Sequence, residues 1–193
     1  MAARPRLVHL NGVPGCGKST LAALYAGRHA RILNLDVDTL VPMVGGWADD
    51  FSAAFDVARG LAAAMAARYL ATGRDVILPQ MITNQRESDD FEEAAASACA
   101  DYVHLVIDVD PTIAMARLDQ RSIGADAVRQ AIRAVIRRNG DLAFIEKLKS
   151  QVDSFAATKA IDGRVDASLV GLEEVYARVA AALSGTGSDA PAI

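Results

Sequence analysis

The chain is poor in cysteine and has no long apolar run. Its 193 residues include two cysteines, Cys16 and Cys99, whose separation does not match the ligand spacing of a zinc site. The alanine-rich stretch 53–71 is interrupted by charged residues such as Arg59 and Arg68, so it is too polar to span a bilayer. The first residues also lack the apolar segment of a signal peptide. We therefore expect a cytoplasmic protein with free thiols and no membrane span.

An excess of basic charge is also missing. The formal net charge is −4, whereas a nucleic-acid-binding surface usually carries a positive excess, so we expect no nucleic-acid partner. Hydrophobic residues make up 52% of the chain and charged residues 23%, proportions typical of a globular protein. The length predicts a single domain over residues 1–184, followed by a flexible tail at 185–193. Both a monomer and a homodimer are compatible with the sequence.

Short apolar segments alternate with helical patterns along the chain. Strands are expected at 7–10, 31–35, 75–78, 102–109 and 158–161. Helices are expected at 19–29, about 50–72, 85–100, 111–121, 126–138, 141–156 and 172–183. Nearly continuous apolar strands between helices are typical of a parallel sheet covered on both faces. The sequence thus predicts an α/β fold, a doubly wound five-stranded parallel sheet of order 2-3-1-4-5 with ligand at the carboxyl ends of the strands.

A glycine-rich loop between the first strand and the first helix has a full phosphate-binding pattern. Residues 12–19 read GVPGCGKS, which matches G-x-x-x-x-G-K-[ST]. Glycines let backbone N–H groups turn toward phosphate oxygens, and the following helix directs its positive end to the same place. Lys18 is expected to reach the β- and γ-phosphates, and Ser19 to bind Mg²⁺. The predicted nucleotide-binding residues are Gly12, Val13, Pro14, Gly15, Cys16, Gly17, Lys18, Ser19 and Thr20.

Motifs of other nucleotide-binding classes are absent. No D-x-x-G occurs, and the Asp162 of Thr158–Asp162 comes one residue too late for the guanine motif of a GTPase. The third apolar segment ends in Gln80, where a motor or transport ATPase usually carries a metal-binding carboxylate. The remaining class is a small phosphotransferase that uses ATP and Mg²⁺, although the sequence does not decide between ATP and GTP.

Two aspartates follow the second predicted strand. Alternation along a strand places Asp36 and Asp38 on the same side, at the sheet edge that carries the glycine loop. One carboxylate could accept a hydroxyl proton while the other binds Mg²⁺. The residues alone leave open which of the two is the base, and Asp36 is also a candidate contact to the substrate.

Further candidate residues lie in two helical regions. Arg117 and Arg121 share a helix face and could offset charge on a transferring phosphoryl group. Residues 121–140 are expected to form a helical lid, whose arginines are compatible with an anion site or with a solvated face. Residues 39–72 are expected to bind the acceptor. Its candidate contacts are Trp47, Arg59 and Gln80, with Asp36.

At these residues the chain resembles a known group. The segments GVPGCGKST and IDVDPTIAMARLDQR, with the aspartates after strand two, resemble small P-loop kinases related to adenylate kinase. Within that group it looks most like the chloramphenicol phosphotransferases and the tunicamycin-resistance ATP-binding proteins. The resemblance implies that Asp38 is the catalytic aspartate and that Arg117 and Arg121 are lid arginines. Gln80 departs from the pattern, since those kinases often have an acid there.

The sequence therefore predicts transfer of the γ-phosphoryl group of ATP to a hydroxyl of a small molecule, such as an antibiotic or a metabolite. One alternative is a protein that uses ATP to capture a ligand without phosphorylating it, as Gln80 would allow. Another is a nucleoside or nucleotide kinase. A base-reading pocket within 39–60 would then be expected, and that stretch has few amide side chains.

Overall fold

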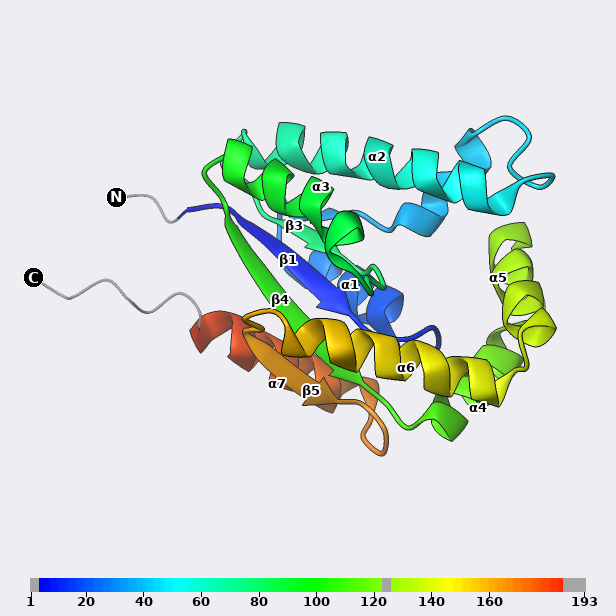
Figure 1. The fold of residues 1–193 in the computed structure, drawn as a ribbon. Helices are drawn as coiled ribbons and strands as arrows, with labels where there is room; N and C mark the ends of the chain where they lie inside the picture. The colour runs from blue at the N-terminus through cyan, green and yellow to red at the C-terminus, as the bar shows by residue number, and fades with distance from the viewer. Residues whose placement is uncertain (1–3, 123–125, 186–193) are drawn as a thin grey trace, which may run out of the picture.

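A computed structural model of the protein describes residues 4–122 and 126–185. Its centre is a five-stranded sheet in which every strand pairs in parallel, in the order β2-β3-β1-β4-β5 (Figure 1). The predicted fold class and strand order are confirmed. The strands are β1 (Arg6–Asn11), β2 (Leu33–Asn34), β3 (Val76–Leu78), β4 (Asp101–Asp108) and β5 (Gly163–Asp166).

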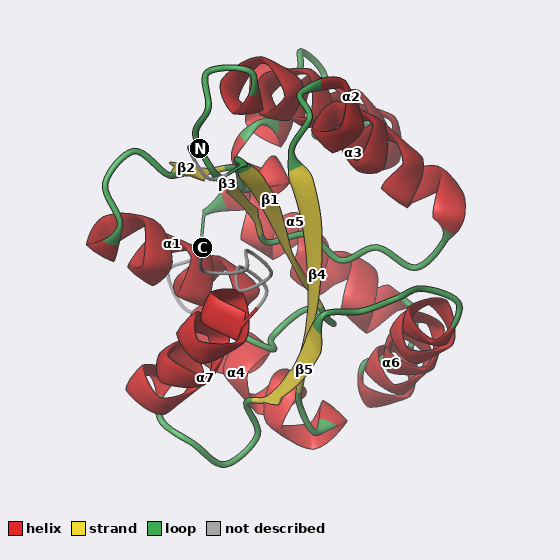
Figure 2. Ribbon diagram, turned by 90° about the vertical axis from the view of Figure 1, so that its left-hand side faces the viewer, coloured by secondary structure: helices red, strands yellow, loops and turns green. Residues whose placement is uncertain are grey.

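Helices cover both faces of this sheet. They are α1 (Lys18–Arg28), α2 (Phe51–Leu70), α3 (Gln85–Ser97), α4 (Pro111–Ser122), α5 (Ala127–Arg138), α6 (Leu142–Ala157) and α7 (Leu172–Gly185). Two short 3-10 turns, η1 (Val37–Thr39) and η2 (Val41–Met43), join β2 to α2. The helices α1 and α7 pack on one face, and α2, α3 and α6 on the other (Figure 2). No helix in the described ranges is long and apolar enough to cross a bilayer.

Side-chain caps begin three of the helices. Asp50, Asn84 and Asp126 each accept a hydrogen bond from a backbone N–H in the first turn of α2, α3 and α5. The start of α3 differs from a standard capping box in one detail. The Glu87 carboxylate accepts from the backbone N–H of Thr83 rather than from that of Asn84.

The position predicted for the fifth strand was wrong. Residues 158–161 form the turn that follows α6, where the Thr158 hydroxyl donates to the carbonyl of Phe155. The strand itself is Gly163–Asp166, and only Val165 within it is buried. Because this edge strand has a single core residue, it lacks an apolar run that hydropathy could detect. The predicted lid, 121–140, and the tail, 185–193, include residues 123–125 and 186–193, which lie outside the described part.

A group of polar side chains is buried in the centre of the sheet, on the face covered by α2, α3 and α6. His9 and Asn11 come from β1, and Tyr102 and His104 from the neighbouring β4. His9 and His104 stack with ring centroids 4.7 Å apart. Burial lowers the pKa of His9 to about 3 and that of His104 to about 4, so both rings are neutral at neutral pH.

These two histidines should make the protein sensitive to mild acid. In the unfolded chain both would bind a proton below pH 6.5, whereas the folded protein resists protonation until about pH 4. The free energy of unfolding should therefore fall as pH drops from about 6.5, by about 1.4 kcal/mol per pH unit for each histidine. Urea denaturation between pH 7 and 5 measures this slope. A His104→Gln variant should have a smaller slope of unfolding free energy against pH, reduced by the contribution of one proton. An unchanged slope would contradict the low pKa of His104.

Candidate active site

The loop from Gly12 to Ser19 connects the carboxyl end of β1 to the start of α1. Its glycines have positive φ angles, 148° at Gly12, 85° at Gly15 and 104° at Gly17. A Cβ atom on Gly12 would lie 2.5 Å from the carbonyl oxygen of Ile107, and one on Gly15 would lie 2.4 Å from that of Ala114. Glycine is therefore needed because β4 and α4 approach the loop closely, in addition to the conformation itself.

The Lys18 side chain folds back over this loop and is almost fully buried. Its ammonium group donates to the backbone carbonyls of Gly12, at 2.6 Å, and Val13, at 3.0 Å. It also contacts the Cys16 sulfur at 3.6 Å. A positive charge thus lies at the mouth of the loop, held by main-chain oxygens.

The amino end of α1 differs from the capped helices described above. Its N-cap residue is Gly17, no described side chain caps it, and its first turn has no acidic residue. The backbone N–H groups of this turn therefore face the loop with the positive end of the helix dipole behind them. Ser19 and Thr20 bring hydroxyl groups to the same end.

Asp36 and Asp38 lie beside this loop, just beyond the end of β2. The Asp36 carboxylate accepts from the backbone N–H of Asp38 at 3.2 Å and begins the η1 turn. Burial raises the pKa of the Asp38 carboxyl to about 6, and the nearby Asp36 charge adds to that rise. A carboxyl group with such a pKa is well suited to accept a proton near neutral pH.

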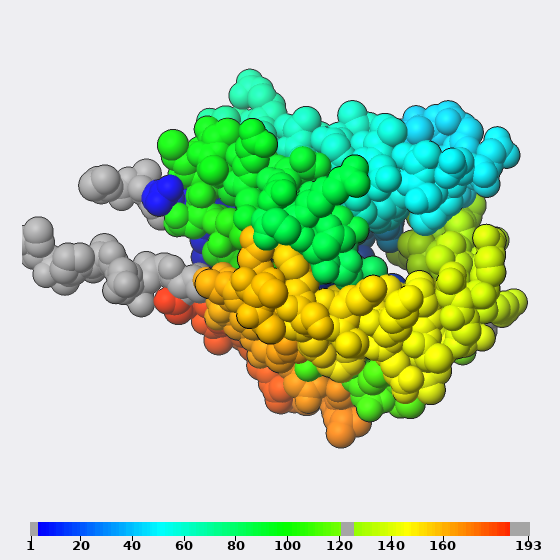
Figure 3. All heavy atoms as spheres, viewed as in Figure 1, coloured from blue at the N-terminus to red at the C-terminus, as the bar shows by residue number. Residues whose placement is uncertain are grey.

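One large cavity, of about 1140 Å³, joins these features. Its phosphate side is lined by Pro14, Gly15, Gly17, Lys18, Ser19 and Thr20. Its opposite side is lined by Asn34, Asp36, Asp38, Thr39, Pro42, Trp47, Phe51, Phe55, Pro79, Gln80 and Met81. Helix α5 and neighbouring residues of α4 and α6 close the remaining side, and a hollow is visible between α5 and the segment leading into α2 (Figure 3). The structure therefore brings the glycine loop, both aspartates, Trp47 and Gln80 around one space.

Among the described side chains, the predicted site residues Arg59 and Arg117 do not line the cavity, and of the glycine loop Gly12, Val13 and Cys16 do not. The Arg117 guanidinium donates to the carbonyls of Ala167, at 2.7 Å, and Ser168. Arg59 lies over the Phe55 ring and pairs with Asp56 at 3.0 Å and Glu87 at 3.7 Å. Arg121 belongs to α4, but its side chain is outside the described part. The roles predicted for these three arginines stay predictions.

Sequence reasoning missed several residues that line the cavity or support it. Met81, Phe144 and Leu148 line it, and their apolar character is no different from that of core residues. Asn11 supports the loop from below, because its side-chain oxygen accepts the N–H of Gly12 at 2.8 Å. A polar residue at the end of an apolar strand, directly before the glycine loop, was the signal available for Asn11.

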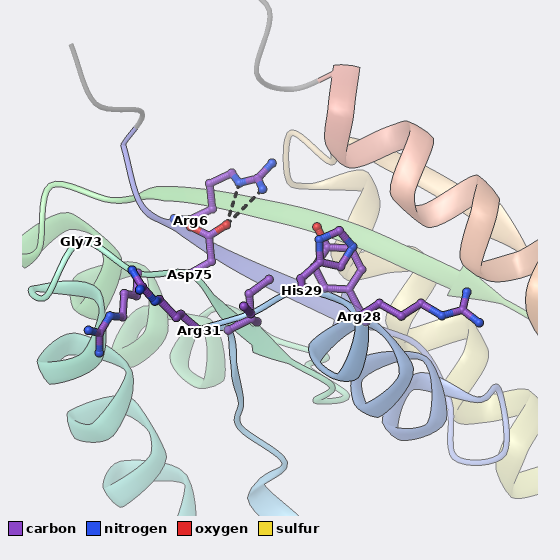
Figure 4. A pocket seen from close by; sticks show the side chains of 10 residues that line it. Arg6, Arg28, His29, Arg31, Gly73 and Asp75 are labelled. Atoms are coloured by element: carbon purple, nitrogen blue, oxygen red, sulfur yellow. Dashed lines mark hydrogen bonds and ion pairs between the residues drawn. The ribbon is translucent and has the colours of Figure 1, made fainter.

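A second, smaller hollow of about 500 Å³ lies at the amino ends of the strands, away from the glycine loop (Figure 4). Four arginines line it, and two of them are engaged by carboxylates. Arg6 pairs with Asp75 at 3.0 Å, and Arg28 points away to pair with Glu173 at 2.8 Å. The large cavity, which has the phosphate loop and the carboxylates together, is the better candidate for an active site.

Comparison with known proteins agrees with this geometry. An AAA domain family model matches residues 7–141, which covers the glycine loop, both aspartates and most of the cavity wall. The chain belongs to this AAA domain family. No curated protein sequence matches the chain significantly.

Several solved structures are similar to this family member, and two of those described here are named as kinases. The APS kinase of Mycobacterium tuberculosis, in complex with AMPPNP and APS, has 19% identity and a TM-score of 0.62 over 94% of this chain and 99% of that one. A gluconokinase from Sinorhizobium meliloti 1021 has 16% identity and a TM-score of 0.62 over 97% and 96%. A chain of the Pnkp1/Rnl/Hen1 RNA repair complex has 19% identity and a TM-score of 0.65 over 83% of this chain. This chain spans only 48% of that longer one.

At these identities the likeness shows the fold, which is that of P-loop kinases. The broad resemblance drawn from the sequence is thereby confirmed. The finer resemblance to chloramphenicol phosphotransferases and tunicamycin-resistance proteins is not confirmed and stays a prediction.

Mg²⁺, which a P-loop implies, fits the oxygen donors of this AAA domain family member. Ser19 offers a hydroxyl and Asp36 a carboxylate to the same cavity. No group of three or more histidine, cysteine or acidic side chains within residues 4–122 and 126–185 could hold a metal by itself. This suits Mg²⁺, which is usually held by one or two protein groups together with substrate phosphates and water.

Replacing Gly15 tests the close packing of the loop. In Gly15→Ala the added methyl group would meet the Ala114 carbonyl at a positive φ, so we expect a loss of about 2 kcal/mol or more in unfolding free energy. Gly27→Ala is the matched control, since nothing lies within 4 Å of its Cβ position in α1. That variant should be neutral or stabilised by up to about 1 kcal/mol. Equal stability of the two variants in urea denaturation would refute the proposed contact.

Proposed function

We propose that the protein is an ATP-dependent phosphotransferase that moves the γ-phosphoryl group to a hydroxyl of a small molecule. One observation carries this proposal. A single cavity is lined by a phosphate-binding loop, two carboxylates and an aromatic wall. A kinase needs these three parts: a place for polyphosphate, a proton acceptor and a surface for the second substrate.

The nucleotide would bind with its phosphates on residues 12–20. The backbone N–H groups at the start of α1 and the ammonium group of Lys18 would hold the phosphate oxygens. Lys18 would exchange its present carbonyl partners for oxygens of the β- and γ-phosphates. These oxygens carry more negative charge than a carbonyl oxygen and therefore form stronger hydrogen bonds with an ammonium group. Mg²⁺ bound through Ser19 and Asp36 would compensate the charge of the phosphates.

In the proposed reaction Asp38 takes the proton of the acceptor hydroxyl. The resulting oxygen bonds to the γ-phosphorus as the bond to the β-phosphate oxygen breaks, so ADP leaves and a phosphate ester forms. Lys18 offsets charge on the transferring group, and Arg117 and Arg121 are proposed to add to it. Helix α5 is proposed to act as the lid that excludes water, since it lines the cavity through Val128, Ile132 and Ile136.

The acceptor side, within the proposed region 39–72, favours an uncharged molecule. Its wall includes Trp47, Phe51 and Phe55, and its charged groups are the Asp36 and Asp38 carboxylates. The arginines of α5 that line the cavity are already paired, Arg133 with Asp119 and Asp141 and Arg129 with Asp126. An anionic acceptor would face two carboxylates, while Lys18 is assigned to the nucleotide and both arginines have carboxylate partners, so its burial would be costly. For this reason a nucleotide kinase is less favoured.

Gln80 supports one rival function, capture of a ligand with ATP but without transfer. Its buried side-chain amide donates to the carbonyl of Met81. An acidic residue at this position could bind a metal ion through its carboxylate, which glutamine lacks. Incubation with ATP, Mg²⁺ and candidate acceptors distinguishes the two functions. Transfer adds the mass of one phosphate to the acceptor, whereas capture leaves its mass unchanged.

Two substitutions test the proposed chemistry. Asp38→Asn should reduce turnover by roughly 10²–10⁴, the range for losing a positioned base, while nucleotide binding survives. Lys18→Ala should weaken or abolish both. Calorimetry with Mg·AMPPNP measures binding, and phosphate incorporation measures turnover. Full turnover in Asp38→Asn would remove this residue from the role of base, and no saturable nucleotide binding by the unmodified protein would reject the whole proposal.

The only tryptophan of the chain can report the charge preference directly. Trp47 lines the acceptor side, so its fluorescence should change when an acceptor binds. With Mg·AMPPNP present, uncharged phenylpropanediol should bind at least about tenfold more tightly than anionic phenyllactate of similar shape. Cationic phenylalaninol tests whether the carboxylates attract an amine, and N-acetyltryptophanamide controls for collisional quenching. Equal or tighter binding of phenyllactate would contradict an uncharged acceptor.

A further inference from the structure

Asn11 uses its full hydrogen-bonding capacity within the protein. Its side-chain oxygen accepts the N–H groups of Gly12, at 2.8 Å, and Ile82, at 3.0 Å. Its side-chain nitrogen donates to the carbonyl of Ile82 at 2.9 Å and contacts Nε2 of His104 at 3.2 Å. An asparagine side chain can accept two hydrogen bonds and donate two, so none is left over. The residue is also completely buried.

These contacts lie where backbone pairing between two strands has ended. β1 pairs with β3 through residues 7–9 and 76–78, but β1 continues to Asn11 while β3 stops at Leu78. Beyond that point side chains of β1 take over. Nε2 of His9 donates to the carbonyl of Gln80 at 2.8 Å, and Asn11 binds both backbone groups of Ile82. The segment 80–82 is thus tied to β1 by two side chains instead of a sheet ladder.

The histidines complete this arrangement in a defined state. Because His9 donates from Nε2, its Nδ1 accepts the hydroxyl of Tyr102 at 2.9 Å. A neutral His104 accepts from Asn11 at Nε2, and its ring is held against that of His9. The Asn11 side chain is therefore held both by the His104 ring and by the backbone of Ile82.

We propose that Asn11 is a positioning residue of the active site. Its amide holds the first residue of the phosphate loop and Ile82, which directly follows the Gln80–Met81 wall of the cavity, at one fixed spacing. This inference rests on the proposed function, because it concerns the same site. It goes beyond that function in assigning the spacing between nucleotide and acceptor to a buried residue that does not line the cavity.

The chemistry of the position explains why asparagine is suited to it. Leucine has a similar size but would leave the N–H of Gly12 and both backbone groups of Ile82 buried without partners. Aspartate could accept the two N–H groups but could not donate to the Ile82 carbonyl, and it would bury a negative charge beneath the phosphates. The position therefore needs a neutral side chain that can both donate and accept hydrogen bonds, and the amide of Asn11 is such a group.

The test compares Asn11→Ala with Leu7→Ala. Leu7 is also fully buried on β1 but lies at the far end of the strand from the loop. Both variants should have a lower Tm, because each loses buried contacts. At a temperature where both are folded, Asn11→Ala should bind Mg·AMPPNP about tenfold more weakly, the factor for one misplaced hydrogen bond. Leu7→Ala should bind like the unmodified protein.

Kinetics provide a second measurement. Asn11→Ala should raise KM for ATP and also lower kcat, since both halves of the cavity shift, whereas Leu7→Ala should change neither. Equal nucleotide affinity of the two variants would overturn the inference while leaving the proposed function intact. Failure of the unmodified protein to bind nucleotide would instead reject the function. If Asn11→Ala does not fold, Asn11→Ser, which keeps one hydroxyl acceptor, takes its place in both measurements with the same expected direction.

Discussion

Parallel pairing of β1 with its neighbours determines where every functional group of this protein can lie. In a parallel sheet the carboxyl ends of all strands meet at one edge, and here the glycine loop, the Asp36–Asp38 turn and the Gln80 segment follow β1, β2 and β3 at that edge. Residues far apart in sequence therefore share one cavity, because the strands that precede them lie side by side. The close approach of the Ile107 and Ala114 carbonyls then leaves room only for glycine at two positions of the loop.

The centre of the sheet contains buried polar side chains, which stabilise the fold less than aliphatic side chains would. Most core positions are aliphatic, yet the face of β1 and β4 beneath the site carries His9, Asn11 and His104. Such groups contribute little net stability unless all of their hydrogen bonds are made. Here His9 and Asn11 make all of theirs, and these bonds extend from the loop to the segment that forms the wall of the cavity. The polar group is therefore better explained by the order it imposes on the site than by the free energy of folding.

Much of the architecture could be predicted because it depends on local patterns. Apolar runs located β1, β3 and β4, and helical spacing of apolar residues located the helices. The glycine pattern identified the phosphate loop for the same reason. β5 was misplaced because Val165 is its one buried residue, and an edge strand with so little apolar content depends on β4 for its position. The contacts of Arg117 with Ala167 and Ser168 join segments fifty residues apart, which no local pattern reports.

The fold also explains why the sequence could place some candidate residues close together but could not predict their individual roles or partners. Strand alternation was expected to put Asp36 and Asp38 on one side, but β2 ends at Asn34 and both aspartates reach the cavity from the η1 turn. The burial that raises the pKa of Asp38 arises only from tertiary packing. The same holds for Arg59, which shares its helix with Phe51 and Phe55 but is drawn to Asp56 and Glu87. Helical spacing shows which residues share a face, and it does not show which ionic partner each will choose.

The position of Lys18 bears on the cost of desolvating its charge. Folding buries this ammonium group and gives it two main-chain oxygens as partners. If a polyphosphate binds as proposed, it would replace two carbonyl oxygens rather than a full shell of water around the charge. Part of the desolvation of the lysine would thus belong to folding and not to binding.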